Sequence, residues 1–514
     1  MPVPLLLPVE LQLIPPPSRH ARARGVVLFP GSYHLGMSTL ATHTLYQLLN
    51  DGDLACERAF VDETQPFLPI RSLETGARLR DFDFIAIPSS YELDWPLIPA
   101  VLEGSGVPAC RHDRLGDGPL VLMGGPAVTA APLPMMPIYD AAFVGEVEPV
   151  IGELRLALLE PSREARLEGL AAIAGFYVPE LHGPPGPRGL RRQCARDLDA
   201  FATCSVILTP HTEFASRFLV EVGRGCGRGC SFCLARQAYH PLRWRSVDHL
   251  LDTVRPALEH TRDVGLIAAA VSDYPDLTGL CTGLAGLSPD LRVTTTSVRM
   301  ESATPEFLAL LARGGQRTVT FAPEAATERL RCHIGKTLAD ASLHAAVERA
   351  LSAGLSRLRL YSMVGLPGET PEDRQAIISL GQQLSETFRQ TRFQFNVGAF
   401  SPRPHTPFEH EPVNDPGVVQ DWITAIVRGL QGVKRLEVSP GSGRQAALQA
   451  IFSRAGCCLG MALGDLAHDQ VADPGYGIIL PALRARGLSP EDLLGPQEPT
   501  EDQPWKVVEM HCAD

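Results

Sequence analysis

The sequence predicts an α/β protein with two successive sheets of parallel strands and a small C-terminal region. Three observations indicate this fold class. Short apolar runs alternate with helical patterns up to residue 182, a second series of such repeats begins near residue 205, and a segment rich in Pro, Gly and Arg separates the two series. Alternating strands and helices are typical of parallel sheets covered by helices. The length of 514 residues also exceeds that of one ordinary domain.

The first series contains four expected strands, each bounded by Gly, Pro or Ser. They lie at 25–29, 84–88, 120–123 and 141–144, with helices expected near 38–50, 94–104 and 147–159. This order predicts a doubly wound sheet over residues 1–182. In such sheets ligands bind at the loops that follow the strands, and here these loops are 30–32, 88–90 and 124–126. Tight turns alone would equally explain the glycines in the loops.

The second series predicts an open, partial β/α barrel over residues 205–410. Residues 183–204 are the expected linker, because 182–192 break all periodicity. Six strand–helix repeats follow it, and the chemistry of such a barrel lies on loops at the carboxyl ends of its strands. The pattern weakens after about residue 411, so 411–514 is expected to be an α-rich C-terminal region. The six expected strands are 218–222, 266–271, 292–296, 317–321, 357–363 and 392–397.

Composition and charge limit the partners of the chain. A formal charge of -12 argues against a general polyanion-binding surface and favours a small-molecule or peptide substrate over nucleic acid. The N-terminus lacks the basic start and cleavage site of a signal peptide, and no apolar run approaches about 18 residues, so we expect a cytoplasmic protein without a membrane partner. In that setting the 12 cysteines are expected to be thiols rather than a disulfide framework.

Three cysteines follow the first strand of the second series. Cys226, Cys230 and Cys233 stand at C-x-x-x-C-x-x-C spacing in a glycine-rich segment. Three thiolates on one such loop can ligate three irons of a cubane cluster, because glycines let the backbone fold closely around the sulfurs. The fourth iron has no nearby cysteine, and an open coordination position is typical of a catalytic metal centre. The alternatives are a tetrahedral zinc with His240 as the fourth ligand and a purely structural cluster.

With the aromatic Phe232 before the last cysteine, this segment resembles the defining motif of the radical S-adenosylmethionine (SAM) superfamily. The resemblance implies a partial (β/α)6 radical SAM barrel and an oxygen-sensitive 4Fe-4S cluster whose open iron is chelated by SAM. In that family an electron from the cluster cleaves SAM, and the resulting 5′-deoxyadenosyl radical abstracts hydrogen from the substrate. The electron implies a reducing partner such as flavodoxin or ferredoxin.

The resemblance also assigns SAM contacts, by matching strand ends of the barrel and the segment 363–369, which resembles the loop that lines the adenine. Each assigned side chain could instead form an ordinary salt bridge or helix cap. No residue is assigned a catalytic role toward the substrate. The assigned SAM contacts are Phe232, Ser272, Asp273, Ser297, Arg299, Glu324 and Gly365.

The first 180 residues resemble the Rossmann-like domain that precedes the barrel in cobalamin-binding radical SAM proteins. The segments 25–39, 121–127 and 143–148 carry this likeness, which extends over most of 25–410. More narrowly, the architecture is similar to a poorly characterised bacterial branch of this group. It implies cobalamin held by the loops that follow the strands. The residues assigned to cobalamin are Ser32, His34, Ser89, Gly124 and Gly125.

The sequence departs from many cobalamin proteins in one respect. It lacks the Asp-x-His-x-x-Gly loop that supplies a lower axial histidine to cobalt. His34 lies on the corresponding loop, but its flanking residues differ from the motif, and an exposed or cap-forming histidine is the expected role. Cobalamin could then bind with water or nothing below the cobalt. Alternatively, the domain could serve only to shape the substrate pocket.

Together the motif and the resemblance imply a radical SAM enzyme that methylates an unactivated carbon with the help of cobalamin. The first alternative is a cobalamin-free radical rearrangement, oxidation or sulfur insertion. Sulfur insertion lacks a second cysteine triad for an auxiliary cluster, and the pair Cys457 and Cys458 is too compact for one. An alternative of another class is a cobalamin- or redox-responsive binding protein without turnover.

Overall fold

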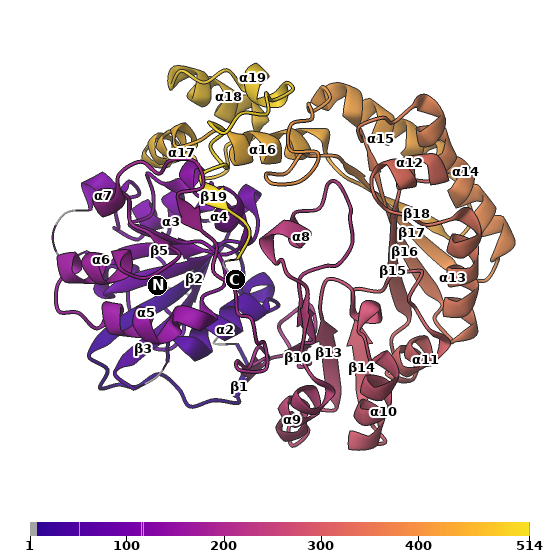
Figure 1. The fold of residues 1–514 in the computed structure, drawn as a ribbon, viewed down its shortest axis with the longest axis horizontal. Coiled ribbons are helices and arrows are strands. Elements are labelled where there is room, and N and C mark those ends of the chain that lie inside the picture. Colours follow the sequence, from indigo (N-terminus) through magenta and orange to yellow (C-terminus); the bar gives the residue numbers. More distant parts are fainter. Residues whose placement is uncertain (1–7, 51, 115, 117, 513–514) are drawn as a thin grey trace. The chain divides into compact units, whose positions relative to one another are not determined.

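The computed structural model describes residues 8–50, 52–114, 116 and 118–512, and it divides into two compact units (Figure 1). Unit 1 comprises the chain up to Arg217, Ile451–Leu493 and the residues from Pro499 onwards, and unit 2 comprises Phe218–Ala450 with Leu494–Glu498. The region expected at 411–514 is therefore shared between the units, and their boundary falls within helix α16 (Gly443–Arg454). The sequence pattern of this region does not indicate which unit each of its helices joins.

Unit 1 contains a six-stranded sheet in the order β3-β2-β4-β5-β6-β7. All neighbouring strands are parallel except β7, which runs antiparallel to β6. Apolar side chains of α5 (Ile151–Leu158) and α6 (Arg163–Ala171) pack against the strands. The expected doubly wound sheet is confirmed. Its strands are β2 (Ala23–Phe29), β3 (Leu54–Phe60), β4 (Phe84–Pro88), β5 (Leu120–Gly124), β6 (Ala141–Phe143) and β7 (Phe176–Tyr177).

The strand order reverses between β2 and β4. After β2 the chain adds β3 on one side and then crosses to place β4, β5 and β6 on the other side. This is the flavodoxin-like order, in which ligands bind at the point of reversal, outside the carboxyl ends of the strands. Helices α2 (Leu40–Leu48) and α3 (Leu97–Gly104) follow β2 and β4 along the chain. The loops that begin at residues 30 and 89 therefore flank the ligand position that this topology provides.

Strand β3 was not expected from the sequence, because two charged residues interrupt its apolar pattern. Glu57 is 3% and Arg58 1% exposed. The Arg58 guanidinium binds a Glu10 oxygen at 2.7 Å and a Glu74 oxygen at 2.7 Å. A buried guanidinium is tolerated when carboxylates satisfy its donors in this way. The strand is thus completed by residues distant along the chain, which the local pattern cannot reveal.

Unit 2 contains seven parallel strands of the expected partial barrel, in two sheets ordered β10-β13-β14 and β15-β16-β17-β18. Helices line the outer side of these strands (Figure 1). The second strand spans 263–267 rather than 266–271, because Val271–Asp273 form a 3-10 turn. The strands are β10 (Phe218–Glu221), β13 (Asp263–Ile267), β14 (Arg292–Thr295), β15 (Thr318–Glu324), β16 (Arg357–Val364), β17 (Arg392–Ala399) and the unexpected β18 (Leu436–Pro440).

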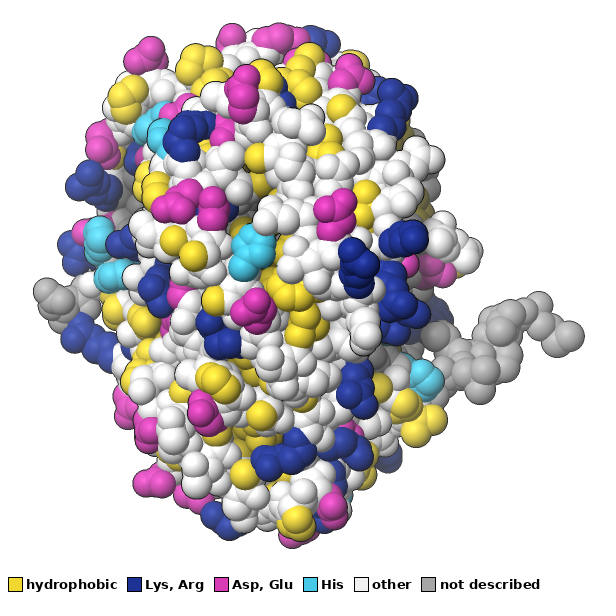
Figure 2. Space-filling view, turned by 90° about the vertical axis from the view of Figure 1, so that its right-hand side faces the viewer, with side chains coloured by type: hydrophobic (Ala, Val, Ile, Leu, Met, Phe, Trp, Pro, Cys, Tyr) yellow, Lys and Arg dark blue, Asp and Glu magenta, His cyan; other side chains and the backbone are white. Residues whose placement is uncertain are grey.

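The helices of unit 2 lie between or after these strands along the chain and complete the strand–helix repeats. They are α9 (Val247–Ala257), α10 (Leu277–Leu287), α11 (Pro305–Arg313), α12 (Glu328–His333), α13 (Asp340–Ser352), α14 (Pro371–Thr387) and α15 (Pro416–Leu430). On the face seen in Figure 2, acidic and apolar side chains lie among the basic ones.

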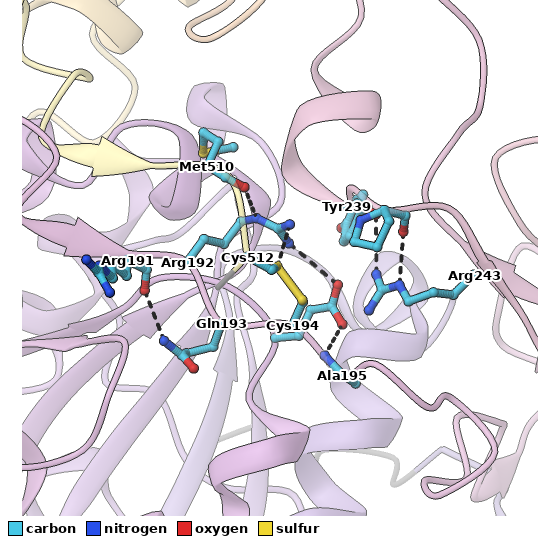
Figure 3. Close-up of a disulfide and its surroundings, with 11 residues drawn as sticks. Arg191, Arg192, Gln193, Cys194, Ala195, Tyr239, Arg243, Met510 and Cys512 are labelled. Atoms are coloured by element: carbon cyan, nitrogen blue, oxygen red, sulfur yellow. Dashed lines mark hydrogen bonds and ion pairs between the residues drawn. A yellow bond between two sulfur atoms is a disulfide. The ribbon is translucent and has the colours of Figure 1, made fainter. Parts of the chain in front are cut away.

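A disulfide joins Cys194 and Cys512 in unit 1, with the two Cα atoms 6.2 Å apart (Figure 3). Strand β8 (Leu190–Arg191) pairs with β19 (Val508–Glu509), and the Arg192 side chain donates a 2.8 Å hydrogen bond to the Met510 carbonyl. The expectation of free thiols is therefore wrong for this pair. The two cysteines are separated by 318 residues, and only the folded chain brings them together.

Within the described residues, no single helix has the length and apolar content of a membrane span. Helices α16 and α17 (Cys458–His468) meet those criteria only as a pair, with a bend of 117° between them.

Stability of unit 1 is expected to depend on pH through Asp94. Burial, with added repulsion from Glu63 and Glu92, raises the pKa of Asp94 to about 6. A raised native pKa means that the charged form destabilises the fold, so the cost is small near pH 4 and complete above pH 6. We expect Asp94→Asn to stabilise the protein by about 1–2 kcal/mol at pH 8, after discounting for solvent screening.

This gain should shrink by about half when the pH is lowered from 8 to 5, as measured by denaturant unfolding of wild type and variant at both values. Equal gains at the two pH values would show that the carboxylate charge is not the cause.

Candidate active site

The three cysteines of the motif lie on one compact loop of unit 2, between β11 (Gly223–Arg224) and α8 (Leu234–Ala238). All three are free and partly exposed. The Cys233 N–H donates to the Cys230 carbonyl at 3.3 Å, which tightens the end of the loop. At its start Gly225 has a φ of 94°, and a Cβ there would lie 2.5 Å from the Tyr239 carbonyl oxygen. Glycine is therefore required at the entry to the loop.

Contacts around Ser231 and Phe232 fix this loop to the rest of unit 2. The Ser231 N–H donates to the Ile334 carbonyl at 2.9 Å, and the Ser231 carbonyl accepts from the Phe408 N–H at 3.1 Å. The Phe232 ring packs against an apolar cluster that also includes Met363, near the end of β16. The ring thus anchors the loop, and its contact with SAM stays a prediction. The buried residues of this cluster are Ala325, Leu330, Ile334, Leu366, Phe400 and Phe408.

The positive charges near the loop favour the thiolate form of Cys230. Burial raises the pKa of the Cys230 thiol, while the charges of Lys336 and Arg299 oppose that rise. Burial also raises the pKa of Cys233. Cluster irons would stabilise the thiolates that burial disfavours. The donor set of three thiols fits a 4Fe-4S cluster with one iron left for another ligand.

A polar network joins the cysteine loop to the loop after β13. The Arg228 guanidinium, between the first two cysteines, places two nitrogens 3.0 Å from the two carboxylate oxygens of Asp273. Ser302 donates to the same carboxylate at 2.5 Å. The Arg299 backbone N–H donates to the Ser272 hydroxyl at 2.8 Å. The fold therefore brings Ser272, Asp273 and Arg299 together at one edge of the barrel, and their contact with SAM stays a prediction.

The charges in this network hold Asp273 ionised. Burial by itself would raise the pKa of Asp273, but the hydrogen bonds from Arg228 and Ser302 and the charge of Arg228 bring that pKa below its ordinary value. The Arg299 guanidinium lies 2.9 Å from Glu301 and 3.7 Å from Asp273. Ser297 lies alongside, and its carbonyl accepts from the Val271 N–H at 3.2 Å. These contacts fix the backbone and charges of both loops.

Glu324 ends β15 in an unusual backbone conformation. Its φ is 67°, and the register of β15 against β16 shifts between Phe321 and Glu324. A left-handed conformation is costly for a side chain with a Cβ, and such strain is common at functional sites. The Glu324 carboxylate accepts a hydrogen bond from the Lys336 ammonium at 3.2 Å, and the two side chains are 13% and 12% exposed. Burial raises the pKa of Glu324, and Lys336 opposes that rise.

The position of Lys336 depends on a close backbone contact with the cysteine loop. Gly335 has a φ of 74°, and a Cβ there would lie 2.3 Å from the Gly229 carbonyl oxygen. Because glycine allows the two backbones to approach this closely, Lys336 projects beside Cys230, where its charge opposes the rise in the Cys230 pKa that burial causes. The Lys336 ammonium therefore adds positive charge to the site.

Gly365 follows β16 with a φ of 82° and is held by two side chains. Its N–H donates to the Glu369 carboxylate at 2.7 Å, and its carbonyl accepts from the Asn414 amide at 3.1 Å. Glu369 is held in turn by the Arg374 guanidinium at 3.1 Å. These hydrogen bonds tie the loop expected to line the adenine to side chains on both sides of it.

Two of the residues assigned to cobalamin stand in α1 and its cap, after β2. Ser32 is the N-cap of α1 (Tyr33–Gly36) and accepts from the Leu35 N–H at 3.4 Å. The His34 side chain is 51% exposed, with its Nε2 atom 3.4 Å from a Glu213 oxygen. An exposed histidine at this position agrees with the expectation from its flanking residues.

The other three residues assigned to cobalamin differ in their surroundings. Ser89 is 1% exposed, and its hydroxyl accepts from the Trp95 indole N–H at 2.8 Å. Gly125 has a φ of 102°, and a Cβ there would lie 2.5 Å from the Ser89 carbonyl oxygen. A Cβ on Gly124 would meet only Phe143, at 3.6 Å, which is an ordinary contact. Ser89 and Gly125 therefore have packing roles, whereas the space beside Gly124 is available.

Sequence reasoning missed Arg228, Lys336 and Asn414. Arg228 lies within the cysteine motif, so its spacing could have indicated a role near the cluster. Lys336 and Asn414 reach the site through contacts with residues distant along the chain. No local pattern marks either residue.

Comparison with known proteins identifies the family. The family model for radical SAM proteins, N-terminal, matches residues 41–179, and the radical SAM superfamily model matches residues 220–381, which include the three motif cysteines. This chain belongs to the radical SAM superfamily. It is a radical SAM enzyme, and the family implies a 4Fe-4S cluster and SAM as its cofactors.

Relatives extend the likeness beyond the barrel. The uncharacterized protein MJ0966 of Methanocaldococcus jannaschii is 29% identical over 398 residues, covering 75% of this chain and 79% of that protein. The uncharacterized methyltransferase PH0819 of Pyrococcus horikoshii is 26% identical, covering 54% of this chain and 61% of that protein. The structure of the radical SAM methyltransferase TsrM from Kitasatospora setae, with cobalamin and a 4Fe-4S cluster bound, matches with a TM-score of 0.54 at 16% identity, covering 76% of this chain and 78% of TsrM. The likeness to TsrM shows a similar fold.

Removing one motif thiol should abolish the cluster. We expect anaerobically purified Cys230→Ala to lose its broad brown absorbance and SAM cleavage, because one missing thiolate leaves an iron unsupported. Iron per chain should fall from about four toward zero. Cys332→Ala, which removes an exposed cysteine elsewhere in unit 2, is the matched control and should retain its iron. Tetrahedral zinc retained in air by the wild-type loop would contradict the cluster.

Substitutions in the Glu324–Lys336 pair should weaken SAM binding without loss of the cluster. We expect Glu324→Gln and Lys336→Gln to retain iron but to weaken SAM binding by about tenfold, since each leaves one charge of a buried pair without its partner. Anaerobic equilibrium dialysis with SAM measures the affinity. The exposed Lys434 provides the control variant Lys434→Gln. Unchanged SAM affinity in both pair variants would remove this pair from the SAM site.

Proposed function

We propose that this radical SAM enzyme binds cobalamin and methylates an unactivated carbon of a small-molecule or peptide substrate. The observation that carries the proposal is the flavodoxin-like order of the unit 1 sheet, which reverses between β2 and β4. A sheet of this order offers a ligand position at the reversal. The chain thus joins a sheet suited to a flat cofactor with a barrel suited to SAM radical chemistry.

The residues at that edge of the sheet fit cobalamin through small groups rather than through a buried histidine. The space beside Gly124, at the end of β5, is available. Ser32 and His34 lie in α1 and its N-cap, after strand β2, which is separated from β5 by β4. Because His34 is 51% exposed, it is not held in a fixed position as a metal ligand would be. Gly124 and Ser32 would accordingly hold cobalamin, and no coordinating role is assigned to His34.

In unit 2 the chain itself supplies positions and charges for SAM. Cys226, Cys230 and Cys233 would hold the cluster, which when loaded and reduced supplies the electron that cleaves SAM. Asp273 is kept ionised by Arg228 and Ser302 and can accept hydrogen bonds from the SAM amino group. The Lys336 and Arg299 cations lie near Cys230, where they can attract a carboxylate. The fixed Gly365 loop would then orient the adenine.

Two relatives support the methyl-transfer part of the proposal. PH0819 carries the name of a methyltransferase, and TsrM is a radical SAM methyltransferase whose structure contains cobalamin. In such chemistry methylcobalamin, when bound, would provide the methyl group that the substrate radical takes up. We further propose that a flavodoxin or ferredoxin supplies the electron that reduces the cluster.

Cobalamin retention tests the cofactor. Protein reconstituted with hydroxocobalamin should carry roughly one equivalent through gel filtration. Gly124→Val should lower that occupancy at least tenfold, because its side chain would fill space that the fold leaves free, with only an ordinary contact to Phe143. Gly118→Val, placed before the same strand at its opposite end and in open space, is the matched control. Equal retention by both variants would remove cobalamin from this edge.

The products distinguish methylation from other radical reactions. Turnover with substrate from a cell extract should form 5′-deoxyadenosine and S-adenosylhomocysteine together, because one SAM would generate the radical and another would be the source of the methyl group. Mass spectrometry of both products, with deuterated SAM methyl as tracer, provides the measurement. Deoxyadenosine without S-adenosylhomocysteine would favour a cobalamin-free radical reaction, and absence of both would favour a binding protein.

A further inference from the structure

A group of three metal-binding side chains lies in unit 1, outside the proposed cofactor sites. Cys110 precedes the 3-10 turn Arg111–Asp113, which itself contains His112 and Asp113. The Cys110 sulfur, an imidazole nitrogen of His112 and a carboxylate oxygen of Asp113 all lie within 4.8 Å of one another. The His112 Nε2 atom is 3.4 Å from an Asp113 oxygen. The radical chemistry proposed above uses none of these residues.

The backbone around the turn is held in place by a buried arginine. Arg114 is 4% exposed, and its guanidinium donates to the Pro108 and Ala109 carbonyls at 2.7 Å each and to Asp140 at 3.1 Å. The Arg111 N–H also donates to the Pro137 carbonyl at 2.8 Å. Because these bonds fix the chain on both sides of Cys110, the three ligand-bearing residues are held together before any ligand arrives.

Cys110 is partly buried, whereas the side chains of His112 and Asp113 are exposed to solvent. The Cys110 sulfur packs against α17, where a Cβ on Gly464 would lie 2.6 Å from it. The side chains of His112 and Asp113 are 70% and 60% exposed. The sulfur is thus fixed by packing, while the nitrogen and oxygen ligands can rotate to meet an ion that enters from solvent.

We propose that Cys110, His112 and Asp113 bind one zinc ion, separate from the iron–sulfur cluster. A thiolate, an imidazole and a carboxylate are ligands that zinc accepts together, whereas magnesium and calcium avoid sulfur. Tetrahedral zinc places its ligand atoms about 3.5 Å apart, so a small rotation of the two exposed side chains completes the geometry. The Cys110 thiol proton passes to solvent on binding, and water takes the fourth position.

The experiment uses the full-length holoenzyme with its cluster loaded, equilibrated anaerobically with one equivalent of zinc and passed through gel filtration. We expect about one zinc per chain besides the iron. Zinc K-edge X-ray absorption should show one sulfur with nitrogen or oxygen ligands. Cys110→Ser and His112→Asn should each weaken zinc binding at least tenfold in a competition with a chelator, while iron content is retained. Cys332→Ser is the control, because it removes an exposed thiol in unit 2, outside the group.

Three outcomes would overturn the proposal. These are failure of the wild-type protein to retain zinc, equal zinc affinity in His112→Asn and wild type, and a zinc spectrum with three sulfur ligands. The last would place zinc on Cys226, Cys230 and Cys233 in chains that lack a cluster. Since His112 is exposed, its substitution does not threaten the fold, and a loss of zinc there reports on binding. Loss of cobalamin or of SAM cleavage has no bearing on this test.

Discussion

Attachment of the cysteine loop at Ser231 is the contact on which the rest of the candidate site depends. The Ser231 N–H donates to the Ile334 carbonyl, and the Ser231 carbonyl accepts from the Phe408 N–H. Two segments that lie far from the motif in the sequence are therefore bound to the same residue of the loop. The Phe232 ring then fills the apolar cluster beside the ends of β15 and β16. These contacts bring Lys336 and Glu324 to Cys230. A free cysteine loop with the same spacing would offer the thiols without the surrounding charges.

Sequence reasoning succeeded where the information is local. The strand–helix alternation predicted the doubly wound sheet and the partial barrel, and the cysteine spacing predicted the cluster loop. Each of these patterns is formed by residues close together in the sequence. It failed where distant residues complete a structure. Strand β3 contains Arg58, whose charge is satisfied only by Glu10 and Glu74. The Cys194–Cys512 pair and Lys336 were missed for the same reason.

The two adjacent glycines after β5 illustrate why a residue type does not fix its role. Gly125 adopts a positive φ and lies against the Ser89 backbone, so its missing side chain is a requirement of the fold. Gly124 has ordinary room for a Cβ, so the fold does not demand glycine there. The sequence assigned both to a cofactor. The distinction matters for experiments, because a bulky residue at Gly125 would disturb the sheet and imitate a loss of cofactor binding.

Two residues at the edge of the barrel have positive φ values, but only one of them is a glycine. Glu324 ends β15 with a φ of 67°, and Gly365 follows the neighbouring strand β16 with a φ of 82°. At Gly365 the conformation carries no steric cost, whereas at Glu324 it does. The fold nevertheless retains a carboxylate at that position, aims it at Lys336 and buries the pair. A residue with a costly backbone and a buried charge persists only where its surroundings require both, and here the surroundings are the loop that presents the three thiols. Glu324 therefore belongs with the cluster loop as part of one charged arrangement rather than with the barrel as a structural cap.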